Sequence, residues 1–497
     1  MVVHFHSGLH TDVDVLIHAR PYMSVRAKFL AKTETSSSTS VSVSRLKMAR
    51  ELDIIIFGAT GFTGKHTVPL VSKLAKTKSR DLTWGVAGRS EKKLKDLLGQ
   101  CEKETGKWHL FCEFSNNVTC SEISLAHIPT IVADVQDEKS LKEMARKARI
   151  VINCCGPYRF FGEPVVKACV EEGTHHVDVS GEPQYMEKMQ LKYHSAAQEK
   201  GVYIVSACGL DSIPCDLGVV FLQQNFTGTL NSVVTYLDFW EEGEPTPGPA
   251  INYGTWESAV YGLAYAKELG SLRRQLFPTR LPSFKPKLEA KKFPHKSSLV
   301  AGWSVPFLGS DRSIVKRSQR CFYEKDSKRP VQIETYFVIK SFLYLLMFAI
   351  FGTIFSFLAR FKYGRSLLLK YPEKFSGGLF SHEQPSEEKL KKSWFSVTLY
   401  GEGWKESLPD ANDEYTTPVD RAVCVKVKGR NPAYGSTCVC LVLSAITLIT
   451  ETDKMPPGGG VYPPGFAFAK TSLADQLNEN GVTFEVVFEK DLHLSKY

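Results

Sequence analysis

The chain has 497 residues, of which 43% are hydrophobic and 23% charged, and its formal net charge is +9. This length predicts two or three domains, and no Lys/Arg stripe with interleaved aromatic residues indicates a nucleic-acid partner. The 12 cysteines form no Cys-x-x-Cys pair and have no histidines at zinc spacing. We therefore expect no metal site and a reducing, intracellular compartment.

Residues 1–50 differ in composition from the rest of the chain. Residues 33–44 are mostly Ser and Thr without apolar periodicity, which predicts a disordered N-terminal extension. Basic residues between positions 20 and 32 would suit a mitochondrial transit peptide, whereas Asp12, Asp14 and Glu34 argue against one. A mitochondrial location therefore stays an alternative.

A strand, a glycine-rich turn and a helix follow one another between residues 53 and 74. Ile54 to Phe57 predict a short buried strand of a parallel sheet, and residues 65–74 predict a helix. Three glycines at three-residue spacing follow the strand, as in dinucleotide-binding loops. Gly58 permits the tight turn, Gly61 lets the backbone approach the pyrophosphate, and Gly64 lets the helix pack close to the strand. The alternative is an ordinary Gly-rich turn. The expected cofactor-binding residues of this loop are Gly58, Ala59, Thr60, Gly61, Phe62, Thr63 and Gly64.

Strands and helices then alternate as far as about residue 215. Further strands are predicted over residues 83–88, 130–134, 150–154, 176–179 and 202–206. Helices are predicted over residues 91–98, 139–146 and 164–172. This alternation is typical of an α/β fold with a Rossmann-type doubly wound parallel sheet, which we place at residues 51–215.

The pattern changes after residue 215. Apolar and polar side chains alternate, as in half-exposed antiparallel strands, over residues 232–239, 331–338 and 395–400. These strands predict a second, α+β domain over residues 216–440. Near the end of the chain, helices are predicted over residues 438–450 and 472–480 and a strand over residues 482–488. We assign residues 441–497 to a C-terminal segment.

An uncharged stretch, residues 341–359, lies inside this second domain. It holds six aromatic residues among 19 and is bracketed by Lys340 and Arg360, so it is long enough to cross a bilayer core of ~30 Å. A crossing would put residues 331–338 and 395–400 on opposite sides of the membrane, although their patterns indicate one sheet. We therefore favour an insertion from one side, with a buried or dimer-interface helix as the alternative.

The residues after the second and third strands indicate which nicotinamide cofactor binds. NAD enzymes usually place Asp or Glu after the second strand. This chain has Arg89 and Ser90, a guanidinium and a hydroxyl that suit a 2′-phosphate. NADP(H) is therefore favoured over NAD(H), with a solvated basic loop as the alternative. Asp134, which ends the third strand, would meet the adenine end or else cap a helix.

Three polar loops follow the later strands, at the edge where doubly wound sheets bind ligands. In the first, we expect Asn153, Cys155 and Gly156 to pass beside the nicotinamide ribose and Tyr158 to face the hydride-transfer side. The other two loops hold further candidate proton donors, namely Asp178, Glu182, Asp211, Ser212 and Asp216. For any one of them, capping of a turn is an equal alternative.

These motifs, taken in order, closely resemble those of the saccharopine dehydrogenase-like oxidoreductases. The resemblance is carried by Phe57–Gly64, Ala87–Arg89, Asn153–Tyr158, Gly181–Pro183 and Gly209–Pro214. It runs from about residue 51 to the C-terminus, and implies a Rossmann domain with an inserted α+β substrate domain and a C-terminal segment that packs back on the first. It also implies membrane or lipid-droplet association in animal members. One mycobacterial relative is a trans-acting enoyl reductase of glycolipid synthesis.

The leading hypothesis is an NADPH-dependent oxidoreductase that acts on a lipid-like or membrane-delivered substrate, with Tyr158 or Asp211 as proton donor or orienting group. The alternative is a non-catalytic NADP(H)-binding sensor or scaffold at a lipid surface. A true saccharopine or amino-acid reductase is a third reading, weakened because no pair of arginines is placed to hold a dicarboxylated substrate. We expect a lipid-droplet or endoplasmic-reticulum surface as the location, and leave a homodimer open.

Overall fold

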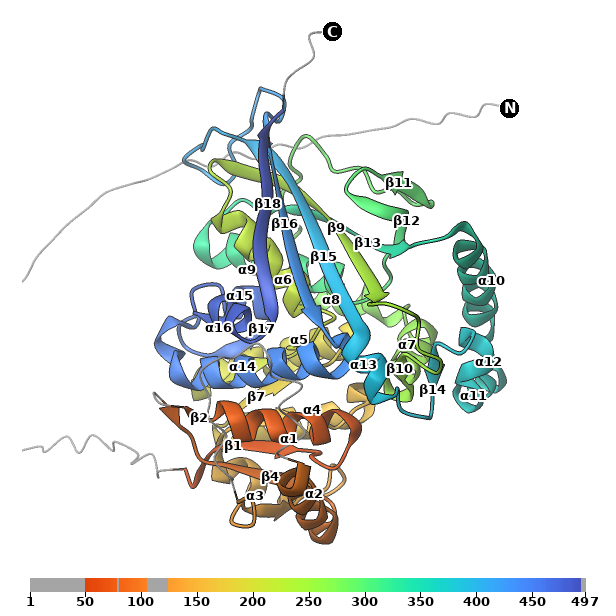
Figure 1. Ribbon diagram of the computed structural model, residues 1–497. Helices are drawn as coiled ribbons and strands as arrows, with labels where there is room; N and C mark the ends of the chain where they lie inside the picture. The colour runs from red at the N-terminus through yellow and green to blue at the C-terminus, as the bar shows by residue number, and fades with distance from the viewer. Residues whose placement is uncertain (1–49, 78–79, 105–123, 493–497) are drawn as a thin grey trace, which may run out of the picture. The chain divides into compact units, whose positions relative to one another are not determined.

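The computed structural model describes residues 50–77, 80–104 and 124–492. The N-terminal extension that the sequence predicts to be disordered lies outside these residues, apart from Arg50. Two seven-stranded sheets form the framework of the described chain (Figure 1).

The first sheet is parallel throughout, in the order β17-β8-β7-β6-β1-β4-β5. Its strands are β1 (Leu52–Phe57), β4 (Trp84–Gly88), β5 (Thr130–Val132), β6 (Ala148–Asn153), β7 (His175–Asp178), β8 (Tyr203–Val205) and β17 (Gly460–Tyr462). The strand order reverses at β1, so the carboxyl ends of β1 and β6 lie side by side, with Phe57 paired to Asn153. The predicted doubly wound sheet is confirmed, with its ligand-binding switch point between β1 and β6.

Different helices cover the two faces of this sheet because alternate residues of β1 point to opposite sides. Ile54 and Ile56 share a buried cluster with one set of helices, and Ile55 and Phe57 with the other. The first set is α1 (Phe62–Leu74), α2 (Glu91–Glu104), α6 (Ile213–Gln224) and α14 (Thr437–Thr450). The second set is α3 (Glu138–Lys147), α4 (Tyr158–Glu172) and α5 (Pro183–Lys200).

Helices α4 and α6 are two of those that differ from the expectation. Helix α4 begins at Tyr158, six residues before the predicted start, and Pro164 lies within it. The predicted start at Pro164 is wrong. Proline is common in the first turn of a helix, so the sequence indicates a helix start there, whereas in α4 this proline lies inside the helix. Helix α6 was not predicted because it is buried on nearly all sides and therefore has no polar face that would produce a helical period.

The second sheet has the order β11-β12-β13-β9-β15-β16-β18. Its strands are β9 (Thr229–Glu241), β11 (His295–Ser297), β12 (Val300–Pro306), β13 (Gln332–Ile339), β15 (Ser393–Trp404), β16 (Arg421–Arg430) and β18 (Val482–Asp491). Residues 331–338 and 395–400 therefore belong to one sheet, as expected. The antiparallel expectation is wrong for β13 and β9, which are parallel. A parallel pair needs a crossover connection, and the chain between these two strands includes helix α9 (Asp311–Asp326).

The remaining elements are short or lie outside the two sheets. The helices are α7 (Tyr253–Ala264), α8 (Glu268–Leu276), α10 (Phe342–Leu358), α11 (Lys362–Lys370), α12 (Pro372–Ser376), α13 (Glu387–Lys392), α15 (Pro464–Ala467), α16 (Leu473–Glu479) and the turns η2 (Pro432–Ser436) and η3 (Thr452–Lys454). Two-stranded sheets are formed by β2 (Lys76–Thr77) with β3 (Arg80–Asp81), and by β10 (Ile251–Asn252) with β14 (Phe380–Ser381).

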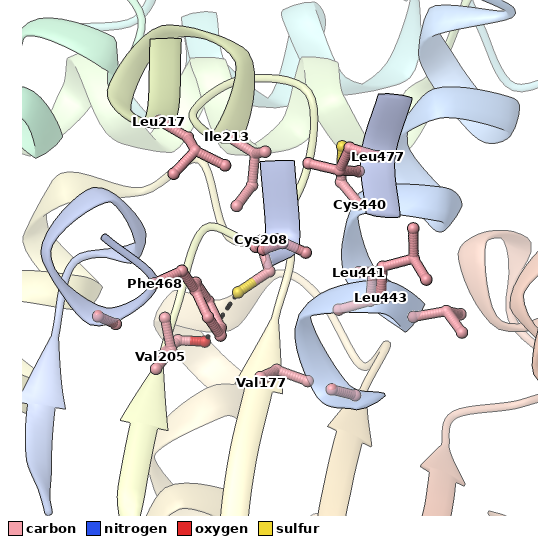
Figure 2. Close-up of a cluster of buried hydrophobic side chains, with 14 of the residues drawn as sticks. Val177, Val205, Cys208, Ile213, Leu217, Cys440, Leu441, Leu443, Phe468 and Leu477 are labelled. Carbon is pink, nitrogen blue, oxygen red and sulfur yellow. Dashed lines mark hydrogen bonds between the residues drawn. The ribbon is translucent and has the colours of Figure 1, made fainter. Parts of the chain in front are cut away.

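One buried cluster joins the two sheets. Figure 2 shows Val177 and Val205 of the parallel sheet below Leu217 of α6 and Leu441 of α14. Val233 of β9 belongs to the same cluster. The C-terminal segment contributes to both sheets, with β17 beside β8 and β18 beside β16.

Within the described chain, one helical segment is long and apolar enough to span a membrane by length and composition, Pro432–Thr450. It comprises η2 and α14, and 72% of its most apolar stretch is buried inside the protein. Because α14 packs on α1 and on strands β6 and β7, this segment is a core element. The apolar helix whose side chains face solvent is α10, described below.

Candidate functional site

The glycine-rich loop between β1 and α1 requires two of its glycines for steric reasons. Gly58 has a φ of +76°, and a Cβ there would lie 2.6 Å from the Sγ of Cys155. A Cβ at Gly64 would lie 2.2 Å from the Gly58 carbonyl oxygen. Helix α1 can therefore approach the loop this closely only with glycine at position 64.

Gly61 has a different environment. The neighbour that a Cβ would meet there is the Gly58 carbonyl oxygen, at 3.1 Å, and the residue is exposed. It immediately precedes α1, and no described side chain caps the helix at this point. The first N–H groups of a helix lack partners within it and lie at the positive end of its dipole. The loop therefore fits the pyrophosphate of a nicotinamide dinucleotide.

Three side chains predicted to bind the cofactor lie at one edge of the sheet. Burial raises the pKa of the Cys155 thiol to about 12, while the charge of Arg89 lowers it and that of Asp134 raises it. Arg89 follows β4, Asp134 follows β5 and Cys155 follows β6, so all three lie at the carboxyl edge of the same parallel sheet. Arg89 is exposed and forms no salt bridge or hydrogen bond with the described part of the chain. Such a guanidinium can take a phosphate bidentately.

Ser90 and Asp134 also support local structure. The Ser90 Oγ accepts the Lys93 N–H at 3.4 Å, at the start of α2. The Asp134 Oδ1 accepts the Gln136 N–H at 3.0 Å, whereas Asp137 caps α3. The alternative that Asp134 caps a helix is therefore wrong, and its contact with the adenine end stays a prediction.

The turn after β6 is braced by buried hydrogen bonds. The buried Asn153 accepts the Cys155 N–H through its Oδ1 at 3.0 Å, and Gly156 is exposed. Tyr158 is buried, donates its hydroxyl to the Asn153 carbonyl at 2.9 Å and accepts the Val179 N–H at 3.4 Å. Burial raises the pKa of Tyr158 well above its usual range. These contacts commit the hydroxyl to the ends of β6 and β7, a bracing role that disfavours Tyr158 as proton donor.

Two of the acidic candidates hold the neighbouring loops in place. Glu182 accepts the backbone N–H groups of Tyr158 at 3.0 Å and of Arg159 at 2.9 Å, so it caps α4. Burial raises the pKa of Asp178 to about 6, against the opposite effect of its hydrogen-bond donors. Those donors are the N–H groups of Ser180 and Ala207 and the hydroxyls of Tyr185 and Ser206.

Asp216, a third acidic candidate, ties α6 to the rest of the fold. Its Oδ2 accepts the Ser318 hydroxyl of α9 at 2.7 Å and the Gly465 N–H of α15 at 2.6 Å. Burial raises the pKa of this carboxyl to about 6. Asp216 is therefore a buried structural link between three segments.

Asp211 differs from these acids because no described group donates a hydrogen bond to its carboxylate. The residue is exposed, and desolvation by the neighbouring protein raises the pKa of its carboxyl above the usual value. A Cβ on Gly181 would lie 3.2 Å from the Asp211 Oδ2, so the carboxylate faces the loop after β7. The neighbouring Ser212 is buried, with its Oγ 3.3 Å from the Oγ of Ser310.

Two residues near the site gave no recognisable signal in the sequence. Asp311, at the start of α9, is buried with an unpartnered Oδ1, and burial and the charge of Asp211 raise its pKa well above the usual range. In the sequence, an acidic residue in the first turn of a helix indicates only that it stabilises the helix dipole, so nothing marks Asp311 as unusual. Tyr434 of η2 lies against α1, with its ring centroid 4.1 Å from that of Phe62, and no local pattern encodes such a distant pair.

Comparisons with known proteins agree with this geometry. Residues 54–205 match the sequence family described as the saccharopine dehydrogenase NADP-binding domain. A human protein named saccharopine dehydrogenase-like oxidoreductase is 37% identical over 445 residues, covering 89% of this chain and 99% of the human protein. A Caenorhabditis elegans protein named lipid droplet localized protein is 37% identical, covering 88% and 99%. An Arabidopsis thaliana protein named "Probable mitochondrial saccharopine dehydrogenase-like oxidoreductase" is 30% identical, covering 88% and 96%.

The first prediction concerns the open side of the glycine loop. Gly61→Val should abolish NADPH binding with the fold retained, because the branched side chain occupies the space where the pyrophosphate approaches. Calorimetric titration with NADPH and circular dichroism measure the two effects. Gly99→Val is the control, since a Cβ at Gly99 meets nothing within 4 Å. Unchanged affinity in the Gly61 variant would exclude this loop as the phosphate site.

The second prediction concerns cofactor choice. Arg89→Asp should weaken NADPH binding by about 1–3 kcal/mol, the scale of a lost charge-assisted contact, and leave NADH binding unchanged. Lys92→Asp, which introduces the same charge change three residues further on, should affect the two cofactors alike. Equal losses for NADPH and NADH in the Arg89 variant would mean that Arg89 does not read the 2′-phosphate.

Proposed function

The chain belongs to the saccharopine dehydrogenase-like oxidoreductases, and from this premise we propose that it reduces a lipid-like or membrane-delivered substrate with NADPH. Its NADP-binding domain and the names of its relatives make it an NAD(P)-dependent oxidoreductase. The observation that carries the lipid part of the proposal is helix α10, whose apolar side chains face solvent.

Helix α10 has apolar residues on all sides, and Leu345 is its one buried residue. Exposed fractions range from 48% to 64% for Phe342, Leu343, Tyr344, Leu346, Phe348, Ile350 and Phe357. Figure 1 shows the helix at the edge of the fold, outside both sheets. Because soluble surfaces seldom expose so large a contiguous apolar patch, we propose a lipid surface as its partner.

The position of α10 in the fold supports contact from one side. At 1.5 Å per residue its 17 residues extend about 25 Å, less than a hydrocarbon core of ~30 Å. Strand β13 before it and strand β15 after it both pair with β9. The chain therefore returns to the side that it left, which supports insertion into one leaflet or a droplet monolayer.

The proposed location follows from the same helix and from the names of relatives. The name of the C. elegans relative supports a lipid-droplet surface, and the cytosolic leaflet of the endoplasmic reticulum would present a similar layer of headgroups over acyl chains. The name of the Arabidopsis relative supports a mitochondrial location as the alternative.

In the proposed reaction the chain binds the substrate and provides a proton. Bound NADPH would supply the hydride. We assign the proton to Asp211, because its carboxyl is accessible, accepts no hydrogen bond from the described chain and has a raised pKa. Tyr158 and Glu182 would then hold the turn beside the nicotinamide end in place.

The third prediction tests this assignment. Asp211→Asn should lower kcat by about 10²–10⁴-fold, the usual contribution of a general acid, with NADPH affinity unchanged. A raised pKa keeps the acid protonated at higher pH, so wild-type kcat should fall as pH rises through that pKa, and the variant should lose this limb. The assay is NADPH consumption with fractionated lipid extracts. NADPH binding without consumption in any fraction would favour the sensor or scaffold.

The fourth prediction tests the lipid contact of α10. Replacing Phe348, Ile350 and Phe357 with Ser should release the protein from vesicles into the soluble fraction, since their burial is worth several kcal/mol at ~25 cal/mol per Å². Phe355 is left intact because its ring packs on Trp256 at 4.9 Å. Val486→Ser with Val487→Ser, exposed on β18, is the control. Retention of the α10 variant on vesicles, with NADPH binding intact, would refute the anchor.

A further inference from the structure

A strongly basic segment, residues 280–296, connects α8 to strand β11. It contains one acidic residue, Glu289, and six basic ones: Arg280, Lys285, Lys287, Lys291, Lys292 and Lys296. These 17 residues therefore carry a net charge of +5, more than half of the +9 of the whole chain. All six basic side chains are exposed, and no salt bridge joins any of them to a described residue.

The basic segment runs along β13 towards the start of α10. The Leu288 N–H donates to the Gln332 Oε1 at 3.0 Å, and the Lys291 N–H donates to the Tyr336 hydroxyl at 2.8 Å. Gln332 is the first residue of β13, and Tyr336 lies further along it. The segment therefore follows the strand in the direction of Ile339, after which α10 begins.

Aromatic contacts connect the end of the segment to α10. The Lys296 Nζ lies 4.5 Å from the ring centroid of Trp303, and that ring lies 6.0 Å from the ring of Phe342, the first residue of α10. Phe293, between Lys292 and Lys296, is 79% exposed. Indole rings are typical of the level where acyl chains meet headgroups.

The other end of α10 has a similar composition. Arg360 and Lys362, which follow α10, are exposed. The aromatic residues that alternate with them are also exposed, Phe361 by 47% and Tyr363 by 76%. Lys340, which precedes α10, is instead paired with Asp238. Cations without a salt-bridge partner in the described chain, and exposed aromatic rings, thus lie near both ends of α10: Lys296 and Phe342 at its start, and Lys362 and Tyr363 after its end.

We propose that the basic segment, together with Arg360 and Lys362, is a docking surface for anionic lipid headgroups that orients the protein on the surface into which α10 inserts. This inference rests on the proposed lipid contact of α10 and adds the chemistry of the preferred lipid. Lysine ammonium groups near a membrane are attracted by its negative surface potential, and the attraction is screened by salt. Negative headgroups should therefore strengthen the binding that insertion of α10 into the apolar interior provides.

The experiment compares binding of the full chain to vesicles of phosphatidylcholine alone and to vesicles that also contain phosphatidylserine. The test variant carries Lys291→Gln, Lys292→Gln and Lys296→Gln. The matched control carries Lys76→Gln, Lys103→Gln and Lys200→Gln, which remove the same charge from exposed lysines of the first sheet domain. Binding is measured by flotation across a range of salt concentrations.

We expect wild type to bind the anionic vesicles more tightly, with a preference that declines as salt rises. The test variant should lose at least about tenfold of its affinity for anionic vesicles at low salt, and keep its affinity for phosphatidylcholine vesicles. The control variant should behave as wild type. Equal losses in test and control variants, or equal wild-type binding to both vesicles, would overturn the inference.

Two further results separate this inference from the proposed function. If the α10 serine variant binds neutral vesicles as tightly as wild type, the proposed anchor is refuted. The headgroup preference is judged separately, from the lysine variant on anionic vesicles. Binding of duplex RNA through the same three lysines, at salt where anionic vesicles are not bound, would assign the segment to a nucleic acid and refute the lipid docking surface.

Discussion

The fold depends on the burial of α6 and α14 between the two sheets. Both helices contribute to the cluster that also contains β1, β7 and β8 of the first sheet and β9 of the second. The C-terminal segment then adds β17 to the first sheet and β18 to the second, so the two sheets share this segment as well as the core. Buried hydrogen bonds to Asn153, Asp178 and Glu182 brace the loops at the carboxyl ends of β6, β7 and β8, as positioning of a hydride acceptor requires.

The acids of these loops divide by their hydrogen bonds. Asp178, Glu182 and Asp216 accept backbone N–H groups and hydroxyls from neighbouring segments, and each thereby fixes two or more of them. Within the described part of the chain, no group donates a hydrogen bond to the Asp211 carboxylate. A carboxylate that stabilises the fold must be surrounded by donors because burial is costly, whereas a group that delivers a proton must remain accessible. Desolvation raises the pKa of all four acids, but among them only Asp211 combines a raised pKa with an exposed carboxyl, as the proposed proton donor requires.

Much of the first sheet domain is predictable because its signals are local. Four apolar residues, Ile54 to Phe57, and glycines at fixed spacing indicate the strand and loop, and the contacts of Gly58 and Gly64 explain the spacing. Long-range features are different. The parallel pairing of β13 with β9 and the contact of Tyr434 with Phe62 depend on which distant segments meet. Asp311 could not be recognised because its unusual property is burial beside Asp211, and burial at a helix N-terminus leaves no pattern in the sequence.

Helix α7 lies between α10, the proposed lipid-contacting helix, and the turn beside the proposed nicotinamide site. On α7, Trp256 packs against Phe355 of α10 at 4.9 Å, and Ser258 donates to the Glu182 Oε1 at 3.0 Å. Glu182 in turn accepts the Tyr158 N–H at the turn beside the proposed nicotinamide site. Trp256 and Ser258 are two residues apart, so a single turn of α7 contacts both the apolar helix and the residue that caps α4. A helix with its side chains is about 10–12 Å thick. A substrate that leaves the lipid beside α10 would therefore need to pass only about the width of α7 to reach the turn beside the proposed nicotinamide site. This proximity favours a substrate that stays partly in the lipid phase over one that is collected from solution.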